Sequence, residues 1–494
     1  MAEEFTNSEN IANRPRLLTL DTEGSERHAS WLELFFDLVF VLAVAKTAHI
    51  LTSHTDPAGF LKFTVLFIPV WWSWVGYTFY ADRFETNEAA YRVLTFMGML
   101  AVIGLSLCLE ESFTPQGDLP FIVCYILVRI VLIVLYIRSA YYVPLARTFS
   151  LQFIVGLGIT CMLLLISVLF DPPVRYVIWG LALFAELATP YINIKLTRIF
   201  PIDHSHIPER LGLFTIIVLG EAVVSTANGA SGVAWDLSTI SSACLGFAMA
   251  VCIWWIVFDF VEDSGIRSKS LFARFVFLYG HFFIVASIIV IGIGVEHAIR
   301  ESAGSRLHFP TLALLSGGVA VFLTAITVIR IIADVCRLVF IRLAGIVFSI
   351  LLLFSGPFLP PFIVLAGFLI VLLGNVWLEN YYAEIAEEGE PEPFLVACEH
   401  ADDMQIFNPN SVEGCEECIV NNYKWVHLRL CLSCGHVGCC DSSVYKHATR
   451  HFREDKHPII ASLEPGENWA WCYEDERFVP LPRVVVNEIN KVED

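Results

Sequence analysis

The chain has 494 residues, of which 56% are hydrophobic and only 16% are charged. Soluble globular proteins carry about 25% charged residues, so this composition excludes an ordinary soluble enzyme or binding protein. The formal net charge is −19, and much of the acidic excess lies in the N-terminal tail and after Glu379. We interpret the acidic run that follows Glu379 as a solvated linker, and we expect no nucleic-acid partner for so acidic a chain.

Apolar runs of 18 or more residues recur from Trp31 to about Tyr381. About 20 apolar residues in a helix span the 30 Å hydrocarbon core of a bilayer. The pattern therefore predicts an all-α polytopic membrane bundle of about twelve transmembrane helices. The predicted helices are 31–52, 60–80, 93–110, 120–141, 148–170, 174–194, 211–228, 236–261, 274–297, 309–329, 338–356 and 359–381.

Basic residues alternate between the two sides of this predicted bundle. The loops after even-numbered helices hold most of them, as the positive-inside rule requires when both termini are cytoplasmic. We therefore expect a multi-pass protein of the cell (inner) membrane, with both termini and the C-terminal domain in the cytoplasm. The residues that we assign to these loops are Arg83, Arg92, Arg138, Arg147, Lys195, Arg198, Arg210, Arg267, Lys269, Arg274, Arg330, Arg337 and Arg342.

Two stretches of the predicted bundle resemble each other at an offset of about 183 residues. Trp71-Trp72 in the second helix matches Trp254-Trp255 in the eighth, and each pair is followed by acidic residues. We interpret this as a 6+6 repeat whose halves are related by an axis along the membrane normal, as in some transporters. The alternative is a chance resemblance between apolar segments.

Ionisable residues also fall inside the predicted helices. Charges in hydrocarbon are costly unless they are paired or wetted, so each is a functional candidate. One interpretation is a polar path for a proton, an ion or a small solute, and the other is a set of buried pairs that fix helix register. The candidates for the path are Glu33, Asp37, Glu186, Glu221, Asp259 and His281.

Three separated segments carry a family resemblance. They are Trp31-Leu32-Glu33-Leu34-Phe35-Phe36-Asp37-Leu38-Val39-Phe40, the stretch from Glu209 to Glu221, and Tyr279-Gly280-His281 with Glu296-His297. Over about residues 28–382 the chain resembles the bacterial low temperature requirement protein A family. The resemblance implies a multi-pass membrane protein, and members of the family are sometimes suspected of transport.

Eight of the 14 cysteines fall between Cys398 and Cys472. Cys415-xx-Cys418 and Cys431-xx-Cys434 are followed by His447, His451 and His457. Two CxxC pairs and spaced histidines are typical of zinc sites, since each pair supplies two thiolates from one turn. The pattern predicts a small α+β zinc-finger domain, because so short a segment seldom folds on its apolar core alone.

The spacing resembles the ubiquitin-specific-protease-type (UBP-type) zinc finger, and the resemblance implies the ligand sets. The first zinc would take Cys415, Cys418, Cys439 and His447. The second would take Cys431, Cys434, His451 and His457. A third site would take Cys398, His400 and Cys472, with Asp475 where other members have a cysteine. Two choices stay open, namely whether Asp475 completes this third site and whether Cys439 or Cys440 is the ligand.

Members that bind ubiquitin grip its free C-terminus with aromatic residues and an arginine. Trp471 and Tyr473 match the aromatic wall and form a candidate peptide pocket, but Cys440-Asp441-Ser442 supplies no cation where the arginine is expected. The resemblance therefore argues against ubiquitin as the ligand. It leaves open another peptide or protein ligand, an intramolecular partner and a purely structural appendage.

The predicted organisation has five parts. We expect a polar cytoplasmic tail (1–30), the transmembrane region (31–381), an acidic linker (382–395), the zinc finger (396–480) and a tail (481–494). The leading hypothesis is a transporter or channel with a regulatory or interaction finger. The alternative is a non-transporting membrane scaffold that recruits a protein through the finger. We expect no enzymatic activity, because the helices contain no HExxH or GxSxG motif and no histidine–carboxylate cluster.

Overall fold

The structure is a computed structural model, and it divides the chain into two compact units, residues 1–380 and 381–494. It describes residues 29–84, 88–192, 206–260, 271–304, 306–332, 339–389, 414–464, 469–475 and 477–479, with residues 15, 196, 200, 398, 400 and 409–411. Most of the predicted N-terminal tail, residues 390–395 of the predicted linker and the predicted C-terminal tail lie outside these residues. So do the predicted loop residues Lys195, Arg198, Arg267, Lys269 and Arg337.

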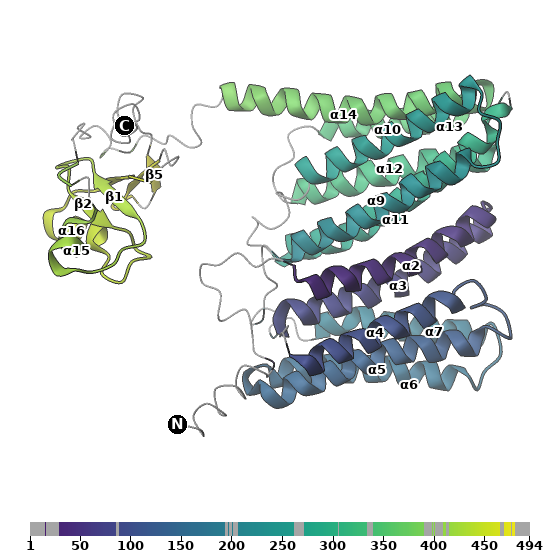
Figure 1. The fold of residues 1–494 in the computed structure, drawn as a ribbon, viewed down its shortest axis with the longest axis horizontal. Coiled ribbons are helices and arrows are strands. Elements are labelled where there is room, and N and C mark those ends of the chain that lie inside the picture. The colour runs from purple at the N-terminus through teal and green to yellow at the C-terminus, as the bar shows by residue number, and fades with distance from the viewer. Residues whose placement is uncertain are drawn as a thin grey trace. The chain divides into compact units, whose positions relative to one another are not determined.

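In the described part of the first unit, twelve helices have 17 or more residues (Figure 1). They are α2 (Trp31–Ser53), α3 (Pro57–Phe84), α4 (Ala89–Cys108), α5 (Asp118–Tyr142), α6 (Arg147–Ser167), α7 (Val174–Ile192), α9 (His206–Ala230), α10 (Leu237–Phe260), α11 (Leu271–Arg300), α12 (Phe309–Ile332), α13 (Val339–Ser355) and α14 (Pro361–Gly389). Short 3-10 turns cover η2 (Pro144–Ala146), η3 (Glu301–Ala303) and η4 (Gly356–Phe358).

Eleven of the described helices are long and apolar enough to cross a membrane. The helix outside this set is α7, which carries Arg175 and Glu186 and which was predicted as a span. The helical membrane region is therefore confirmed, while the twelfth crossing stays a prediction. Large apolar side chains cover the outside of the unit; Trp31 and Phe340, for example, are 88% and 85% exposed. Such a surface suits lipid and not water.

The first unit consists of two groups of helices, α2–α7 and α9–α14 (Figure 1). They meet where α2 and α3 pack against α9 and α11, and we call this contact the seam. Its centre is aromatic: the Phe214 ring lies 4.5 Å from Trp74 and 5.4 Å from Trp71, and Phe67 lies 5.5 Å from Phe282 between ring centroids. Burial of such large rings holds the two groups together.

Local sequence explains where α2 begins. Ser30 is its N-cap: the Glu33 N–H donates to the Ser30 hydroxyl, and the Ser30 N–H donates to the Glu33 carboxylate at 2.9 Å. This S-x-x-E arrangement is a capping box, which satisfies two otherwise unpaired donors at the start of a helix. The box also fixes the carboxylate of Glu33 at the first turn.

Helix α9 begins five residues earlier than the sequence predicted, at His206 instead of 211. Pro208 does not prevent this, because proline is tolerated in the first turn of a helix. The prediction that Arg210 lies in a loop is therefore wrong: it is buried within α9, 1% exposed. Helix α14 likewise runs on to Gly389, so the first residues of the predicted linker are helical.

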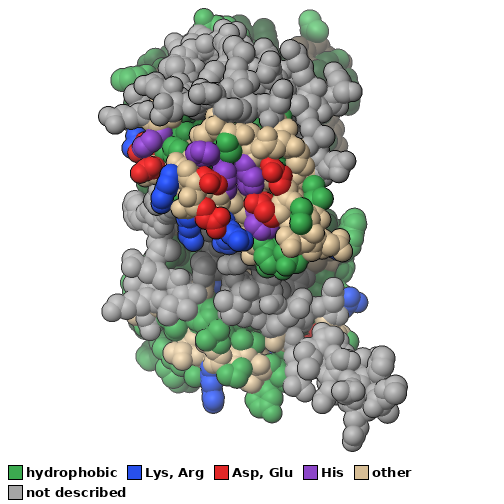
Figure 2. Space-filling model, turned by 90° about the vertical axis from the view of Figure 1, so that its left-hand side faces the viewer, with side chains coloured by type: hydrophobic (Ala, Val, Ile, Leu, Met, Phe, Trp, Pro, Cys, Tyr) green, Lys and Arg blue, Asp and Glu red, His purple; other side chains and the backbone are tan. Residues whose placement is uncertain are grey.

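The second unit is a small α+β domain. An antiparallel sheet of five strands has the order β2-β1-β3-β4-β5, with two short helices. The elements are α15 (Glu416–Asn421), β1 (Leu428–Cys431), β2 (Val437–Cys439), α16 (His447–Asp455), β3 (Ile459–Ser462), β4 (Ala470–Cys472) and β5 (Arg477–Val479). Figure 2 shows one face of the whole chain. Most of its charged and histidine side chains gather in one area, and most of its hydrophobic side chains lie outside that area.

Close packing of α6 on α7 gives a test of the fold. A Cβ at Gly156 would lie 2.2 Å from the Thr189 hydroxyl, whereas a Cβ at Gly158 would meet nothing within 4 Å. We expect Gly156→Ala to destabilise the protein by about 1–3 kcal/mol through overpacking. Gly158→Ala is the matched control and should be neutral or slightly stabilising, because both changes improve helix propensity. Thermal unfolding in detergent measures both, and equal midpoints would contradict this packing.

Candidate functional site

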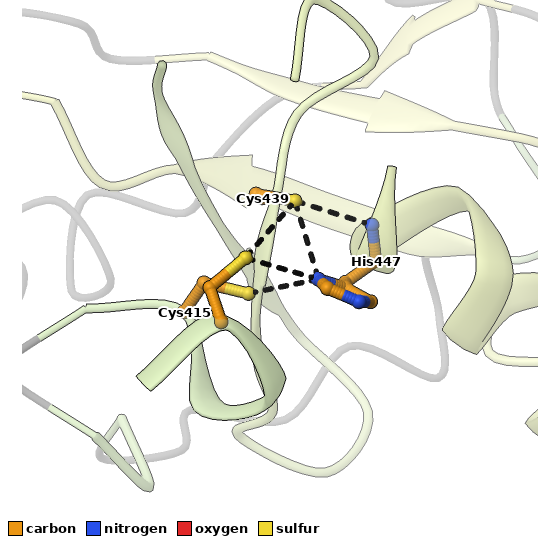
Figure 3. Close-up of side chains that lie close together, drawn as sticks. Cys415, Cys439 and His447 are labelled. Atoms are coloured by element: carbon orange, nitrogen blue, oxygen red, sulfur yellow. Dashed lines mark hydrogen bonds between the residues drawn. The ribbon is translucent and has the colours of Figure 1, made fainter. Parts of the chain in front are cut away.

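The first cluster of metal-ligand side chains joins α15, β2 and α16. The Nδ1 atom of His447 lies 3.2, 3.3 and 3.4 Å from the sulfur atoms of Cys415, Cys418 and Cys439, and the last two sulfur atoms are 3.9 Å apart. Figure 3 shows the side chains of Cys415 and Cys439 facing this imidazole from the same side. With Zn–S near 2.3 Å and Zn–N near 2.0 Å, a tetrahedral zinc site places its ligand atoms about 3.5–3.8 Å apart. The cluster therefore fits zinc.

Glycine at position 438 makes this cluster possible. A Cβ there would lie 2.6 Å from the backbone nitrogen of Ala448, so a larger residue would push α16 away from β2. The close approach places His447, the first residue of α16, beside Cys439. The adjacent Cys440 faces elsewhere, with its sulfur 3.8 Å from His427 and 3.6 Å from Ser443. Of the two cysteines between which the sequence left the choice open, the structure thus places Cys439 in the cluster.

The second cluster consists of Cys431, Cys434, His451 and His457. The Nε2 atom of His451 lies 3.2 Å from the Cys434 sulfur and 3.1 Å from Nδ1 of His457. Its other ring nitrogen lies 2.8 Å from the Asp455 carboxylate. A carboxylate behind a ligand histidine fixes the tautomer that presents a lone pair to the metal, so the geometry is suited to a cation.

The third cluster consists of Cys398, His400, Cys472 and Asp475. Nδ1 of His400 lies 3.8 Å from both sulfur atoms and 3.5 Å from the Asp475 carboxylate. The four ligand atoms all lie within 4.8 Å of one another, as they do in the other two clusters. Carboxylates are accepted zinc ligands, so Asp475 stands where a fourth ligand is needed.

Burial disfavours ionisation of four thiols in these clusters. Burial raises the pKa of the Cys415 and Cys418 thiols, and it raises the pKa of Cys431 and of Cys398 to about 11. Zinc binds the thiolate and not the thiol, so metal binding must displace these protons. The apolar core of the finger is small, with Leu430, Val437 and Ile459 among its members. Metal binding would therefore favour folding of the domain.

The two predicted pocket aromatics lie apart on the sheet. Trp471 of β4 packs edge-on against Phe478 of β5, with 5.0 Å between the ring centroids. Tyr473 stacks on Phe452 of α16 at 4.9 Å, and its hydroxyl forms a hydrogen bond with the Thr449 hydroxyl at 3.1 Å. Thr449 also donates to Asp441, so the position where the resemblance expects an arginine holds an acid.

A nearby cation was missed by the sequence analysis. Arg429 of β1 lies over the Trp469 ring, 4.6 Å from its centroid, and donates to the Ser462 hydroxyl at 3.1 Å. Strand pairing brings Arg429 opposite Ser462, although the two are 33 residues apart. Only the order of the strands in the sheet could have revealed this neighbour.

In the membrane region, Arg210 joins the two groups of helices at the seam. Its guanidinium lies 2.6 Å from the Glu33 carboxylate and 2.5 Å from the Asp37 carboxylate, both on α2. The Asp37 carboxylate also accepts the Trp74 indole N–H at 2.7 Å. All three ionisable side chains are at most 3% exposed, so the pairing offsets the large cost of burying each charge.

His206 extends this network by one turn of α9. Its ring nitrogens lie 3.1 Å from the Glu33 carboxylate of α2 and 3.1 Å from the Asp82 carboxylate of α3. We call Glu33, Asp37, Asp82, His206 and Arg210 the Arg210 cluster. Its five ionisable side chains come from three helices that belong to both groups. The expectation that the helices hold no histidine–carboxylate cluster is therefore wrong.

The other predicted path residues lie outside this cluster. Glu186 of α7 pairs with Arg129 of α5 at 2.9 Å, within the first group. His281 is buried on α11, where its Nδ1 atom lies 2.7 Å from the Phe277 carbonyl. Glu221 is half-buried on α9, and Asp259 is exposed at the end of α10. Of the six predicted residues, the structure brings only Glu33 and Asp37 together.

Sequence reasoning missed several partners in the membrane region. His206 and Arg210 were placed in or beside a loop, and Arg342 was counted as a loop residue although it is 1% exposed and pairs with Glu379 of α14. An available signal was the balance of charge: the acidic residues inside the predicted spans required basic partners, and basic residues stood close to the predicted helix ends.

The Arg210 cluster leads to a stability prediction. Arg210→Gln leaves two buried carboxylates without their partner, and breaking a buried pair in this way costs about 3–5 kcal/mol. Lys46→Gln is the matched control: Lys46 also pairs with a glutamate, Glu110, but the two side chains are 36% and 41% exposed, so we expect a loss of about 1 kcal/mol or less. Unfolding in detergent compares the two, and equal losses would show that Arg210 is not paired as described.

Comparison with known proteins separates the chain into the same two parts. Residues 28–376 match the family described as "Bacterial low temperature requirement A protein (LtrA)". Residues 415–483 match "Zn-finger in ubiquitin-hydrolases and other protein". The "Uncharacterized protein RA0937" of Rhizobium meliloti (strain 1021) is 29% identical over 339 residues, which are 60% of this chain and 79% of that protein.

The finger has relatives of its own. Ubiquitin carboxyl-terminal hydrolase 44 of Xenopus tropicalis is 37% identical over 79 residues, but these are 16% of this chain and only 11% of the hydrolase. The solution structure of protein RPA1320 from Rhodopseudomonas palustris is 49% identical and covers 18% of this chain and 85% of its own, with a TM-score of 0.17. From its membrane region, the chain belongs to the bacterial low temperature requirement A family, and a UBP-type zinc finger follows that region.

Proposed function

We propose that the protein is a transporter or channel for a proton, an ion or a small solute, and that the Arg210 cluster is its working centre. The observation that carries this proposal is the position of the cluster. Five ionisable side chains, each at most 3% exposed, lie where the two groups of helices meet. Ionisable residues buried in a membrane bundle usually mark such a path.

The charges of the cluster support coupling to a proton. Among the described residues it holds three carboxylates, and the nearby positive charges are Arg210 and Arg83, which lies 3.9 Å from Asp82. One further positive charge makes the group neutral, and a net charge is expensive in a low dielectric. His206, between Glu33 and Asp82, supplies that charge when it binds a proton.

The predicted 6+6 repeat belongs to the same proposal, because it would let one group of helices rock against the other. The packing orders of the two groups support it. In each group the first helix packs on the second and third, the third on the fourth, and the fourth on the fifth. An arginine of the fourth helix also pairs with a glutamate of the sixth in both, Arg129 with Glu186 and Arg330 with Glu379.

Flux measurement tests the transport proposal. Purified protein in liposomes that contain a pH-sensitive dye should dissipate an imposed proton gradient faster than empty liposomes. Asp37→Asn removes one charge from the cluster with little change of shape, and we expect it to lower this flux at least about tenfold, a change of about 1.4 kcal/mol in the barrier.

Glu186→Gln is the matched control, because Glu186 is equally buried but lies outside the seam. We expect flux within about twofold of the unmodified protein for this variant, a difference well below 1 kcal/mol. If the unmodified protein moves no proton, ion or small solute, the proposal fails.

The second candidate function is a membrane scaffold. The observation that favours it is that other buried charges pair within one group of helices, as Arg342 does with Glu379. Pairing of this kind suits a purely structural role. In that case the finger would recruit a protein, and the absence of flux together with normal folding would support this candidate.

We also propose that both termini and the finger lie in the cytoplasm of a cell (inner) membrane. The support comes from basic residues near the helix ends at the face of the bundle where α2 begins. Arg92, Arg138 and Arg147 are among them. Arg83, Arg210 and Arg342 carry less weight, since all three are buried. A reducing compartment would keep the finger's thiols available for metal. There the finger would act as a regulatory or interaction module with a peptide or protein ligand.

We propose that the finger holds three zinc ions, one in each cluster. Elemental analysis of the purified chain should give about three zinc per molecule, and chelation should unfold the finger. His400→Ala and Asp475→Ala should each lower the content to about two. Cys440→Ser is the control and should leave the content unchanged, because Cys440 faces His427 and Ser443. If the unmodified chain held two zinc ions and His400→Ala did not lower that number, the third site would be ruled out. A zinc content near zero would rule out all three sites.

A further inference from the structure

A lateral groove of about 530 Å³ lies along one face of α3 in the first group of helices. Its other walls come from α5, α6, α7 and the segment that precedes α5. Five aromatic side chains line it, namely Phe113, Phe121, Tyr125, Tyr176 and Trp179. Their rings already pack on one another, with centroids 5.1 Å apart for Phe121 and Trp179 and 5.2 Å for Phe113 and Tyr176. The groove is therefore preformed and apolar, as ligand sites commonly are.

The groove opens toward the lipid and not only toward water. Leu61 and Val65, on its α3 wall, are 63% and 42% exposed, and on its α7 wall Gly180 is exposed. All three lie within spans or helices of the membrane region, where acyl chains replace water. The stretch of α3 from Lys62 to Pro69 is about 10 Å long. An apolar tail can enter sideways from the bilayer and lie along this stretch.

One end of the groove carries a positive charge. Lys62 is the charged residue among the described lining residues, and its ammonium donates to the Glu110 carbonyl at 2.6 Å. The Glu110 carboxylate is engaged by a different residue, Lys46, at 3.0 Å. An ammonium has three N–H donors, so Lys62 keeps two of them for an anionic headgroup. The headgroup would lie near Glu110, just beyond the C-terminal end of α4.

A second groove provides a comparison on the opposite face of α3. It has about 670 Å³ and is lined by Phe60, Phe63, Phe67 and residues of α11 and α12. The charged residue among its described lining residues is Asp56, whose carboxylate accepts the Gly59 N–H at 2.8 Å. The two grooves are similarly apolar, but their charges are opposite, so an anionic headgroup suits only the groove at Lys62.

We propose that the Lys62 groove is a binding site for an anionic phospholipid, with an acyl chain against the aromatic wall and the headgroup phosphate on the Lys62 ammonium. The charge of Lys62 selects the headgroup, and the lateral opening selects a ligand that is dissolved in the bilayer. This inference is independent of the transport proposal, because the groove lies outside the Arg210 cluster.

Binding of phosphatidylglycerol and phosphatidylcholine with identical acyl chains to the full chain tests the proposal. Native mass spectrometry of the protein in neutral detergent counts the lipids that stay bound. We expect one phosphatidylglycerol to bind about tenfold more tightly than phosphatidylcholine, as an added charge-assisted hydrogen bond would give. Lys62→Gln should remove this preference.

Two further variants separate the groove from the rest of the surface. A Cβ at Gly180 would meet nothing within 4 Å, so Gly180→Leu should fill the groove without disturbing the fold, and it should abolish binding of the preferred lipid. Asp56→Asn in the opposite groove is the matched control and should leave the preference unchanged. Equal binding of the two lipids by the unmodified protein would overturn the proposal. So would unchanged phosphatidylglycerol binding in Gly180→Leu or in Lys62→Gln.

Discussion

Arg210 of α9 lies between the carboxylates of Glu33 and Asp37 on α2, at 2.6 and 2.5 Å. A charge that is surrounded by apolar side chains is tolerated only with an opposite charge at contact distance. Each of these three residues therefore requires the others, and they belong to the two groups of helices. The aromatic packing of Trp74 on Phe214 supplies contact area at the seam, while the charges supply its specificity. Pairing across the seam is the constraint on which the arrangement of the two groups depends.

The finger depends on a comparable constraint. Its apolar core is small, and twelve ligand side chains in three clusters converge at distances that suit zinc. Burial raises the pKa of the Cys415 and Cys431 thiols, so a metal would have to displace the protons of these two residues. Metal ions would thus stabilise the finger, much as buried ion pairs stabilise the membrane unit. In both units a few electrostatic contacts decide how apolar surfaces are brought together.

Local patterns account for what could be predicted from the sequence. Apolar runs mark helices wherever they lie. The CxxC pairs, the histidine spacing and the family resemblance predicted most members of the three clusters, while the choice between Cys439 and Cys440 and the role of Asp475 stayed open. Contacts between distant segments could not be predicted in this way. Arg210 is 173 residues from Asp37, and nothing near either residue names its partner. The start of α9 at His206 was missed for the same reason, because partners on α2 and α3 make it possible to bury polar residues in its first turn.

A double-mutant cycle between Asp37 and Arg210 tests the central claim most directly. The free energy of unfolding would be measured for Asp37→Asn, for Arg210→Gln and for the double variant, in the same detergent. Paired residues should show a coupling energy of about 1–3 kcal/mol, because the second substitution costs little once the first partner is gone. Effects that add within about 0.5 kcal/mol would contradict an ion pair across the seam, and with it the account of how the two groups of helices are joined.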